Sequence, residues 1–297
     1  IIGASTGYGL ASRITAAFGC HAATLGIMFE KPSNGKRTAT PGWYNTAAFE
    51  EEAAKEGLYA KSINGDAFSK EVKEQAISMI KEDLGKVDMV IYSLAAPRRT
   101  DAQGKMWVST LKTTDKPFTE KSLDLRTNTI VTKTVEPAEE GELEGTIKVM
   151  GGEDWMDWID AMKAADVLEK DAVTVAYSYI GPELTYPIYY DGTIGQAKRH
   201  LTKTAGEINE KYQDVKAYIS VNKALVTQAS AAIPIVPLYF AILYKVMKEQ
   251  GTHEGCIQQI ARLFKDKLLA DPVPADEKYQ IRMDDWELSD SVQDQVM

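Results

Sequence analysis

Cysteine and histidine are scarce in this sequence of 297 residues, which contains two cysteines and three histidines. Cys20 and Cys256 lie too far apart to suggest a disulfide framework or a cysteine-based zinc site. His253 is followed by a glutamate but does not continue into the H-E-x-x-H zinc motif. We therefore expect no metal site, and the low cysteine content favours a reducing compartment, the cytoplasm.

Basic residues and long apolar runs are also lacking. There are 34 Lys and Arg against 43 Asp and Glu, which gives a formal net charge of −9 and a pI near 5.1. A nucleic-acid partner requires clustered positive charge, so we expect none. The longest apolar run, residues 231–244, contains two prolines and is shorter than the about 20 residues that a membrane helix needs. Because no basic cluster precedes an apolar stretch after Ile1, we predict neither a membrane span nor a signal peptide.

The sequence does contain a regular alternation of short apolar and longer amphipathic stretches. Ile1 and Ile2 have the character of the end of a strand. The predicted strands are 23–29, 58–63, 87–94, 172–180 and 215–221; the predicted helices are 8–18, 43–56, 69–84, 155–168, 193–212, 227–249 and 254–269; no element is assigned after Pro272. Strands that alternate with helices indicate βαβ units. We therefore predict an α/β fold with a doubly wound parallel sheet of the Rossmann type, similar to short-chain dehydrogenases.

One long stretch interrupts this alternation. Residues 98–150 are rich in Thr, Lys and Asp, and their strand candidates at 107–111 and 128–134 are short. The stretch is too short and too polar to bury a core of its own, so we predict an insertion at the carboxyl edge of the sheet within a single domain, residues 1–297. The helical region 227–269 is predicted to form a wall on the substrate side.

Gly3, Gly7 and Gly9 form a G-x-x-x-G-x-G pattern between the strand end and the first predicted helix. Glycines at such a junction permit a tight turn and let a pyrophosphate approach the backbone. The N-terminus of the helix adds free N–H groups and the positive end of the helix dipole. We predict a dinucleotide-binding turn, and the alternative is a tight turn that binds no ligand.

The same glycine turn also matches G-x-S-x-G, the nucleophile elbow of α/β-hydrolases. This alternative would make Ser5 the nucleophile and His200 or His253 its base. It requires several strands ahead of the elbow, where the sequence has only a two-residue strand end.

Residues that follow the next three predicted strands favour the dinucleotide interpretation. Glu30 is placed to hydrogen-bond the adenosine ribose and to repel a 2′-phosphate, which favours NAD over NADP. Asp66 and Ala67 lie where an adenine ring would rest, and Leu94 and Ala95 lie where small residues would let the backbone approach the nicotinamide ribose. The alternative for each is an ordinary strand-end turn, and Glu30 could instead pair with one of the nearby cations.

A reductase of this fold needs a proton donor near the reacting carbonyl and a cation near the nicotinamide ribose. The Y-x-x-x-K spacing of short-chain dehydrogenases occurs at Tyr212 and at Tyr244, a frequency expected by chance, and we discount both. Tyr189 and Lys198 would face opposite sides of an unbroken helix. The Asp-Gly turn between them breaks the helix and lets them converge, with Thr193 as a candidate cap.

Several longer strings resemble the FabV-type trans-2-enoyl reductases, which are NADH-dependent reductases of enoyl-CoA or enoyl-acyl-carrier-protein thioesters in fatty-acid metabolism. The strings include GASTGYGLASRI, GIMFEKP, YSLAAP, VMGGEDW, AYSYIGPE, YDGTIGQAK and NKALVTQAS. The resemblance runs from Gly3 to about Leu288. It implies NADH as cofactor, an acyl-CoA or acyl-carrier-protein thioester as substrate and a monomer as the favoured state. It also implies a chain shorter than the family pattern at both ends.

The resemblance implies a role for individual residues. Tyr189 would be the proton donor, Lys198 a catalytic and cofactor-binding lysine, and Tyr179 a substrate contact. The implied cofactor contacts are Gly3, Ala4, Ser5, Thr6, Gly7, Tyr8, Phe29, Glu30, Asp66, Ala67, Leu94, Ala95, Lys198, Leu225, Val226 and Thr227. The alternatives are a carbonyl-reducing NAD(P)-dependent dehydrogenase and a non-catalytic nucleotide-binding fragment.

Overall fold

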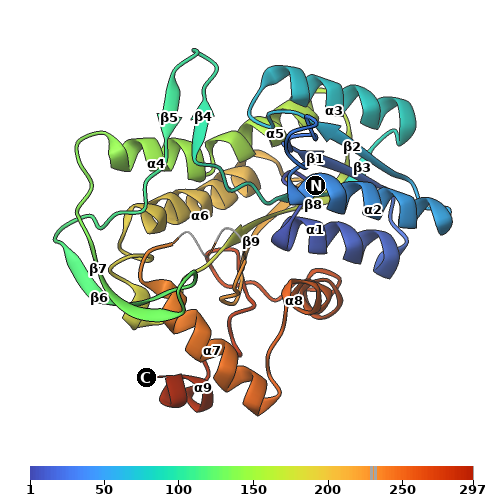
Figure 1. Ribbon diagram of the computed structural model, residues 1–297. Helices are drawn as coiled ribbons and strands as arrows, with labels where there is room; N and C mark the ends of the chain where they lie inside the picture. The colour runs from blue at the N-terminus through green and yellow to red at the C-terminus, as the bar shows by residue number, and fades with distance from the viewer. Residues whose placement is uncertain (228–229, 231–232, 297) are drawn as a thin grey trace.

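The computed structural model describes residues 1–227, 230 and 233–296, and its framework is a sheet with helices on both faces (Figure 1). The strands are β1 (Thr24–Met28), β2 (Ala60–Asn64), β3 (Val87–Tyr92), β4 (Arg98–Thr100), β5 (Met106–Val108), β6 (Phe118–Asp124), β7 (Thr129–Val135), β8 (Leu168–Ser178), β9 (Val215–Val221) and β10 (Gln280–Arg282). The α-helices are α1 (Gly7–Ile14), α2 (Pro41–Lys55), α3 (Lys70–Asp83), α4 (Glu142–Met150), α5 (Glu153–Ala164), α6 (Thr193–Lys211), α7 (Val236–Gln250), α8 (Cys256–Leu263) and α9 (Asp290–Val296).

The central sheet is parallel throughout. β1 pairs with β2, and β3, β8, β9 and β10 pair in that order. Ile2 bridges Ile27 of β1 on one side and Tyr92 of β3 on the other, so it joins the two halves. The order across the sheet is therefore β2, β1, Ile2, β3, β8, β9, β10. The first residues of the chain lie in the middle of the sheet, and later strands are added on either side of them. The predicted doubly wound sheet is confirmed.

Different helices pack against the two faces of the sheet. Successive residues of a strand point to opposite faces. Val90 and Tyr92 of β3 therefore belong to the core cluster formed with α3, α5 and α6. Ile91, between them, belongs to the cluster formed with α1 and α8. Because both faces are covered, β3 is apolar without interruption from Met89 to Tyr92.

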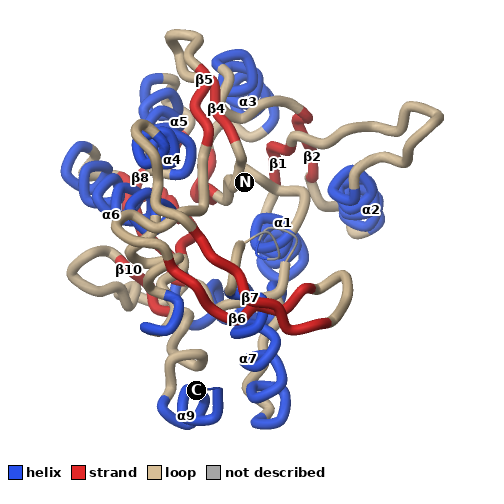
Figure 2. Tube along the Cα trace, turned by 60° about the vertical axis from the view of Figure 1, so that its left-hand side comes forward, coloured by secondary structure: helices blue, strands red, loops and turns tan. Residues whose placement is uncertain are grey.

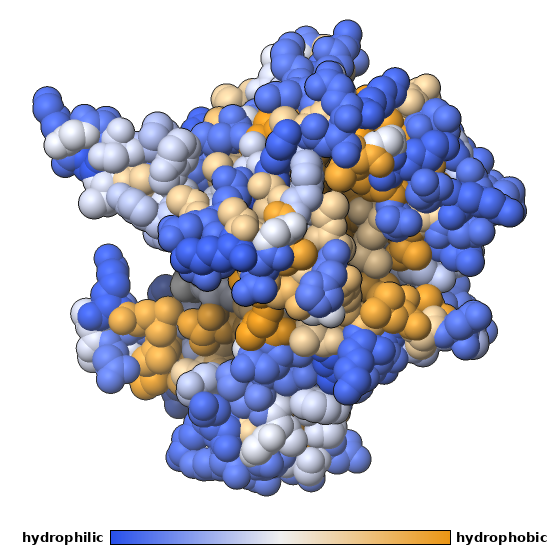
Figure 3. All heavy atoms as spheres, turned by 90° about the vertical axis from the view of Figure 1, so that its right-hand side faces the viewer, coloured by the Kyte–Doolittle hydropathy of each residue, from blue (hydrophilic) through white to orange (hydrophobic). Residues whose placement is uncertain are grey.

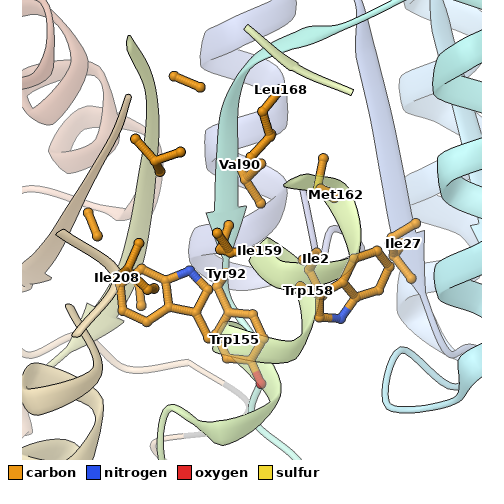
Figure 4. Close-up of a cluster of buried hydrophobic side chains, with 14 of the residues drawn as sticks. Ile2, Ile27, Val90, Tyr92, Trp155, Trp158, Ile159, Met162, Leu168 and Ile208 are labelled. Carbon is orange, nitrogen blue, oxygen red and sulfur yellow. The ribbon is translucent and has the colours of Figure 1, made fainter. Parts of the chain in front are cut away.

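Two tryptophans of α5 lie in the larger core cluster (Figure 4). Trp155 and Trp158 are both fully buried. The indole N–H of Trp155 donates to the Thr174 hydroxyl at 2.8 Å, and that of Trp158 donates to the carbonyl of Ala67 at 3.1 Å. Each side chain thus adds a large buried surface and still satisfies its one polar group. The bond to Ala67 also fixes the turn that follows β2.

Residues 98–150 contain two antiparallel hairpins, β4–β5 and β6–β7, followed by α4. The predicted short strands correspond to β5 and β7, but their partners β4 and β6 were not predicted. β4 has three residues, and β6 carries polar side chains on both faces, so neither has the alternation that identifies a strand. β6 packs against α7, and the β6–β7 hairpin lies well below the β4–β5 hairpin in Figure 2.

Two predicted helix boundaries are wrong. The helix predicted over 155–168 ends at Ala164, because Leu168 already belongs to β8. The helix predicted over 227–249 begins only at Val236, although four of its residues, 228–229 and 231–232, lie outside the described residues. Its first turn contains a proline, which is tolerated there and not in a helix interior.

The tail after Pro272 contains regular structure that the sequence analysis did not assign. β10 pairs with β9 and is the outermost strand on that side of the central sheet. α9 packs against α7. Both elements are too short to leave a periodic pattern. No helix in the described part of the chain is both long and apolar enough to cross a membrane.

A cavity of about 430 Å³ lies beside Ile1 and Ile2, between β1 and β3. Its walls are mostly apolar and include Leu25, Val87 and Phe264. Apolar side chains also gather across the middle of the face shown in Figure 3, bordered by hydrophilic ones.

Candidate active site

The predicted site residues lie along the carboxyl edge of the central sheet, which is the side where its parallel strands end. The strands are parallel, so the residues that follow their carboxyl ends lie along the same edge. The glycine turn follows Ile2, and the other candidates follow β1 (Phe29, Glu30), β2 (Asp66, Ala67), β3 (Leu94, Ala95), β8 (Tyr179) and β9 (Leu225, Val226, Thr227). The parallel strands therefore place these segments along the same edge of the sheet.

The glycine turn is tightly packed against the protein at Gly3 and Gly9 and open at Gly7. Gly3 has φ +86°, and a Cβ there would lie 2.5 Å from the carbonyl oxygen of Ser93. A Cβ at Gly9 would lie 1.8 Å from the carbonyl oxygen of Gly3, so a side chain is excluded at both positions. Gly7, the first residue of α1, faces open space, and Thr6 at the N-cap makes no side-chain capping bond. The free N–H groups of this helix end fit a phosphate.

Glu30 is fixed beside the glycine turn. One carboxylate oxygen accepts a hydrogen bond from the Ser5 hydroxyl at 2.6 Å, and the other accepts from the Thr40 hydroxyl. The Glu30 backbone also exchanges two hydrogen bonds with the side chain of Asn64, at 2.8 and 2.9 Å. Across the described residues, Glu30 forms no ion pair with Lys31 or another cation. The carboxylate is therefore oriented by neutral hydroxyl groups and keeps its negative charge uncompensated.

The contacts of Ser5 argue against the hydrolase interpretation. Its hydroxyl donates to Glu30 and not to a histidine. The Nδ1 atom of His200 accepts instead from the backbone N–H of Gly152 at 3.0 Å. His253 packs edge-on against Tyr244, with ring centroids 4.6 Å apart. Neither histidine is positioned as a base for Ser5.

A buried ion pair supports the turn that follows β2, and sequence reasoning missed it. The ammonium of Lys73 donates to Asp154 at 2.6 Å, and the Tyr92 hydroxyl donates to the other carboxylate oxygen at 3.0 Å. Lys73 also donates to the carbonyls of Ala67 and Phe68 at 3.3 and 3.1 Å. Burial raises the pKa of Asp154, and Lys73 opposes that rise. The pair thus ties α3, α5 and the end of β3 together beneath the edge.

Tyr189 lies outside α6, as predicted, and Lys198 lies within it. Tyr189 belongs to the turn before the helix, and its backbone N–H donates to the carbonyl of Thr185 at 2.8 Å. The expected cap is wrong: the N-cap is Gly192, and Thr193 is already helical. The Thr193 hydroxyl donates to the carbonyl of Thr110 at 2.5 Å, so it attaches α6 to the segment between β5 and β6.

Tyr189 and Lys198 differ in how their polar groups are satisfied. The ammonium of Lys198 donates to the carbonyl of Tyr177, at the end of β8, at 2.9 Å. Burial lowers the pKa of Lys198 to about 8, because desolvation disfavours the charged form. Burial raises the pKa of Tyr189, so its hydroxyl stays protonated. This hydroxyl makes no hydrogen bond with the residues that the structure describes, and it is free to donate to a ligand.

The discounted tyrosine–lysine pairs lie elsewhere. The Tyr212 hydroxyl donates to Asp160 at 2.8 Å, and Lys216 approaches Asp171 at 3.9 Å. These residues lie at the amino-terminal end of β9, on the opposite edge of the sheet from the glycine turn. Tyr244 is on α7 and 47% exposed.

Tyr179 packs directly against Tyr189. The two rings meet edge to face, with centroids 4.8 Å apart and an interplanar angle of 81°. The Tyr179 hydroxyl donates to Glu287 at 2.9 Å. Glu287 lies in the C-terminal tail, where sequence reasoning identified no functional residue and where no motif marks it.

The segment after β9 is held by short-range hydrogen bonds. The Ser230 hydroxyl donates to the carbonyl of Leu225 at 2.7 Å, and the N–H of Thr227 lies 2.7 Å from the same hydroxyl oxygen. The Tyr8 hydroxyl donates to the carbonyl of Lys223 at 2.8 Å, which joins this segment to the helix of the glycine turn. Val226 stays 59% exposed, and so does Phe29 at 78%. Both apolar surfaces border the same edge of the sheet as the glycine turn.

No group of three or more His, Cys, Asp or Glu side chains within the described ranges is arranged to hold a metal ion. The uncapped helix end, the oriented carboxylate and the exposed apolar surfaces instead fit a dinucleotide.

Comparison with known proteins gives consistent matches along the chain. Two family models match, the NAD(P)H binding domain of trans-2-enoyl-CoA reductase at residues 1–35 and the trans-2-enoyl-CoA reductase catalytic region at residues 37–269. A trans-2-enoyl-CoA reductase (NADH) of Clostridium perfringens is 60% identical over 99% of this chain and 76% of the relative. An enoyl-acyl-carrier-protein reductase (NADH) of Flavobacterium johnsoniae is 58% identical over 100% of this chain and 76% of the relative. The crystal structure of Treponema denticola trans-2-enoyl-CoA reductase in complex with NAD has a TM-score of 0.97 and 52% identity, covering 100% of this chain and 75% of that one.

Proposed function

The chain belongs to the trans-2-enoyl-CoA reductase family, and from this premise we propose that it reduces the C2=C3 double bond of trans-2-enoyl thioesters with NADH. The observation that carries the proposal is the protonated Tyr189 hydroxyl, which has no hydrogen-bond partner among the described residues, at the sheet edge that also holds the glycine turn and Glu30. One similar relative is named for a CoA thioester and another for an acyl-carrier-protein thioester, so both are candidate substrates.

When bound, NADH supplies the hydride that adds to the β-carbon of the substrate. Negative charge then develops on the thioester oxygen, and the Tyr189 hydroxyl donates a hydrogen bond to it. A proton that Tyr189 would supply, and then regain from water, is delivered to the α-carbon and completes the saturated acyl thioester. A preorganised donor of this kind is worth about 10²–10³ in kcat. The ammonium of Lys198, close to the end of β8, contributes positive charge for the cofactor and favours proton delivery.

The proposed cofactor contacts follow the edge of the sheet. The glycine turn would hold the pyrophosphate, because its helix end is uncapped and open. Glu30 would accept hydrogen bonds from the adenosine ribose and disfavour a 2′-phosphate. The remaining proposed contacts are Asp66 and Ala67 at the adenine, Leu94 and Ala95 at the nicotinamide ribose, and Leu225, Val226 and Thr227 at the nicotinamide.

We further propose that the acyl chain occupies an apolar cavity of about 240 Å³ whose lining includes Ile188, the residue before Tyr189 in the sequence. The cavity lies between β6, the turn before Tyr189 and α7; its lining includes Phe118, Leu184, Ile188, Ile235, Leu238 and Ile242. In this proposal residues 98–150 are an insertion in a single domain, and residues 227–269 form the opposite wall of the substrate site.

The decisive experiment follows NADH oxidation at 340 nm with crotonyl-CoA and with crotonyl-acyl-carrier protein. We expect turnover with at least one of them and none with acetoacetyl-CoA. Turnover only with the ketone would identify a carbonyl reductase instead. NADH binding, measured separately by fluorescence, without turnover of any acyl substrate would identify a non-catalytic nucleotide-binding protein.

A further inference from the structure

A single buried carboxylate joins three elements around the Tyr189 site. Glu287 follows β10 and has no solvent exposure. One of its oxygens accepts hydrogen bonds from the hydroxyls of Tyr179 and Tyr239, at 2.9 and 2.7 Å. The other accepts from the backbone N–H of Ala224 at 2.6 Å. Three donors converge on this carboxylate, and each belongs to a different part of the active-site wall.

The partners of Glu287 connect it to both halves of the site. Tyr179 follows β8, and its ring packs on that of Tyr189. Ala224 directly precedes Leu225, the first of the proposed nicotinamide contacts. Tyr239 belongs to α7, the proposed wall of the acyl cavity. A displacement of Glu287 would therefore shift Tyr189 through Tyr179. It would also shift the segment that begins at Leu225 through Ala224.

Burial raises the pKa of Glu287, and the hydrogen bonds that it accepts from Ala224, Tyr239 and Tyr179 oppose that rise, so these donors favour the charged carboxylate. Lys223 is buried nearby, and its ammonium donates to the carbonyl of Ala224 at 3.0 Å. The Gln293 amide donates to the Tyr239 hydroxyl at 3.2 Å, so Tyr239 must direct its own proton to Glu287. A carboxylate that receives three hydrogen bonds is strongly favoured over an amide, which would turn an N–H group toward one of these donors.

We propose that Glu287 is a positioning residue for the reduction. It orients Tyr179 and the segment ahead of Leu225, and through them it sets the Tyr189 ring against the nicotinamide. The Tyr179 hydroxyl directs its proton to Glu287, so Tyr189 is left as the only donor of the pair toward the substrate oxygen. This inference rests on the proposed function, and it assigns to Tyr179 a structural bond in place of a hydrogen bond donated to the substrate.

The test compares Glu287→Gln with Asp160→Asn. Asp160 also accepts a hydrogen bond from a tyrosine hydroxyl, that of Tyr212 at 2.8 Å, but it lies toward the opposite edge of the sheet from the glycine turn and contacts none of the proposed site residues. We expect Glu287→Gln to lower kcat by about 10- to 100-fold and to raise the Kd for NADH by about tenfold, because small displacements of reacting groups are costly. The KM for crotonyl-CoA should change little, and Glu287→Asp should restore part of kcat. Asp160→Asn should lower the melting temperature without changing kcat.

A double-mutant cycle separates positioning from simple destabilisation. If Glu287 acts through Tyr179, adding Tyr179→Phe to Glu287→Gln should lower kcat by less than the product of the two single effects. Multiplicative effects, or a Glu287→Gln enzyme with wild-type kcat and NADH affinity, would overturn the proposal. If Glu287→Gln does not fold, Tyr179→Phe and Tyr239→Phe each remove one donor, and unchanged kcat and Kd in both would overturn it equally. The Kd for NADH is measured without substrate, so this arm remains informative even if the wild-type enzyme fails to reduce enoyl thioesters.

Discussion

The Tyr189 hydroxyl is the one polar group of the proposed mechanism that the described residues leave without a partner. Tyr189→Phe removes it and keeps the ring that packs on Tyr179. We expect kcat to fall by about 10²–10³ while the Kd for NADH stays nearly constant, because one donor to the developing oxyanion is lost. Steady-state kinetics with crotonyl-CoA and fluorescence titration with NADH check both parts. Wild-type turnover would remove Tyr189 from the mechanism.

Lys198 gives the enzyme a pH dependence of definite sign. Its pKa of about 8 means that it is charged below pH 8 and neutral above. The anionic cofactor favours the charged form, so the Kd for NADH should rise as the pH increases through about 8. Lys198→Arg, which stays charged, should flatten this rise, whereas Lys216→Ala, at the opposite edge of the sheet, should leave it unchanged. The same profile in Lys198→Arg would assign the titration to another group.

Glu30 determines the expected choice of coenzyme. Its carboxylate is fixed by Ser5 and Thr40 and forms no described ion pair, so it would meet a 2′-phosphate as an uncompensated like charge. Such repulsion in a partly screened site costs on the order of 1–4 kcal/mol. Glu30→Ala should therefore raise kcat/KM for NADPH more than it lowers kcat/KM for NADH. Kinetics with both coenzymes decide the point, and an unchanged ratio would leave Glu30 without a role in selectivity.

At the scale of elements, the ion pair between Lys73 and Asp154 links α3, α5 and β3 beneath the cofactor edge. Asp154→Ala leaves a buried ammonium without its partner, and we expect it to lower the free energy of unfolding by about 3–5 kcal/mol. The double variant Lys73→Met/Asp154→Leu should be less destabilised than Asp154→Ala, because no charge remains buried. Urea denaturation of the three proteins measures this. Equal stability of Asp154→Ala and wild type would contradict the coupling.

Elements with strong periodicity could be predicted from the sequence, and short or mixed ones could not. β1, β3 and β9 are largely apolar stretches bounded by turns, and their positions are confirmed within a few residues. β6 and β10 lack such a pattern, since they form through pairing with a neighbour. The same distinction applies to the site. Glu30 and Tyr179 could be located because they follow predictable strands, whereas Glu287 reaches the site through a tertiary contact that no local pattern encodes.

At the scale of the whole molecule, the direction of the strands determines where chemistry can occur. Every strand of the central sheet runs the same way, so one edge collects the turns after β1, β2, β3, β8 and β9. The other edge collects the amino-terminal ends and with them Tyr212 and Lys216. The Y-x-x-x-K spacing alone does not show on which of these two edges a tyrosine–lysine pair lies, but the strand order and direction do.

The exposed apolar surfaces at this edge have a calorimetric consequence. Phe29 is 78% and Val226 59% exposed, and both border the proposed cofactor site. Removing apolar surface from water lowers the heat capacity. NADH binding should therefore show a negative change in heat capacity by isothermal titration at several temperatures, and Phe29→Ser should reduce its magnitude. An identical value in wild type and Phe29→Ser would mean that the cofactor leaves Phe29 uncovered. With a negative heat-capacity change, the binding enthalpy becomes more favourable on warming while the binding entropy becomes less so.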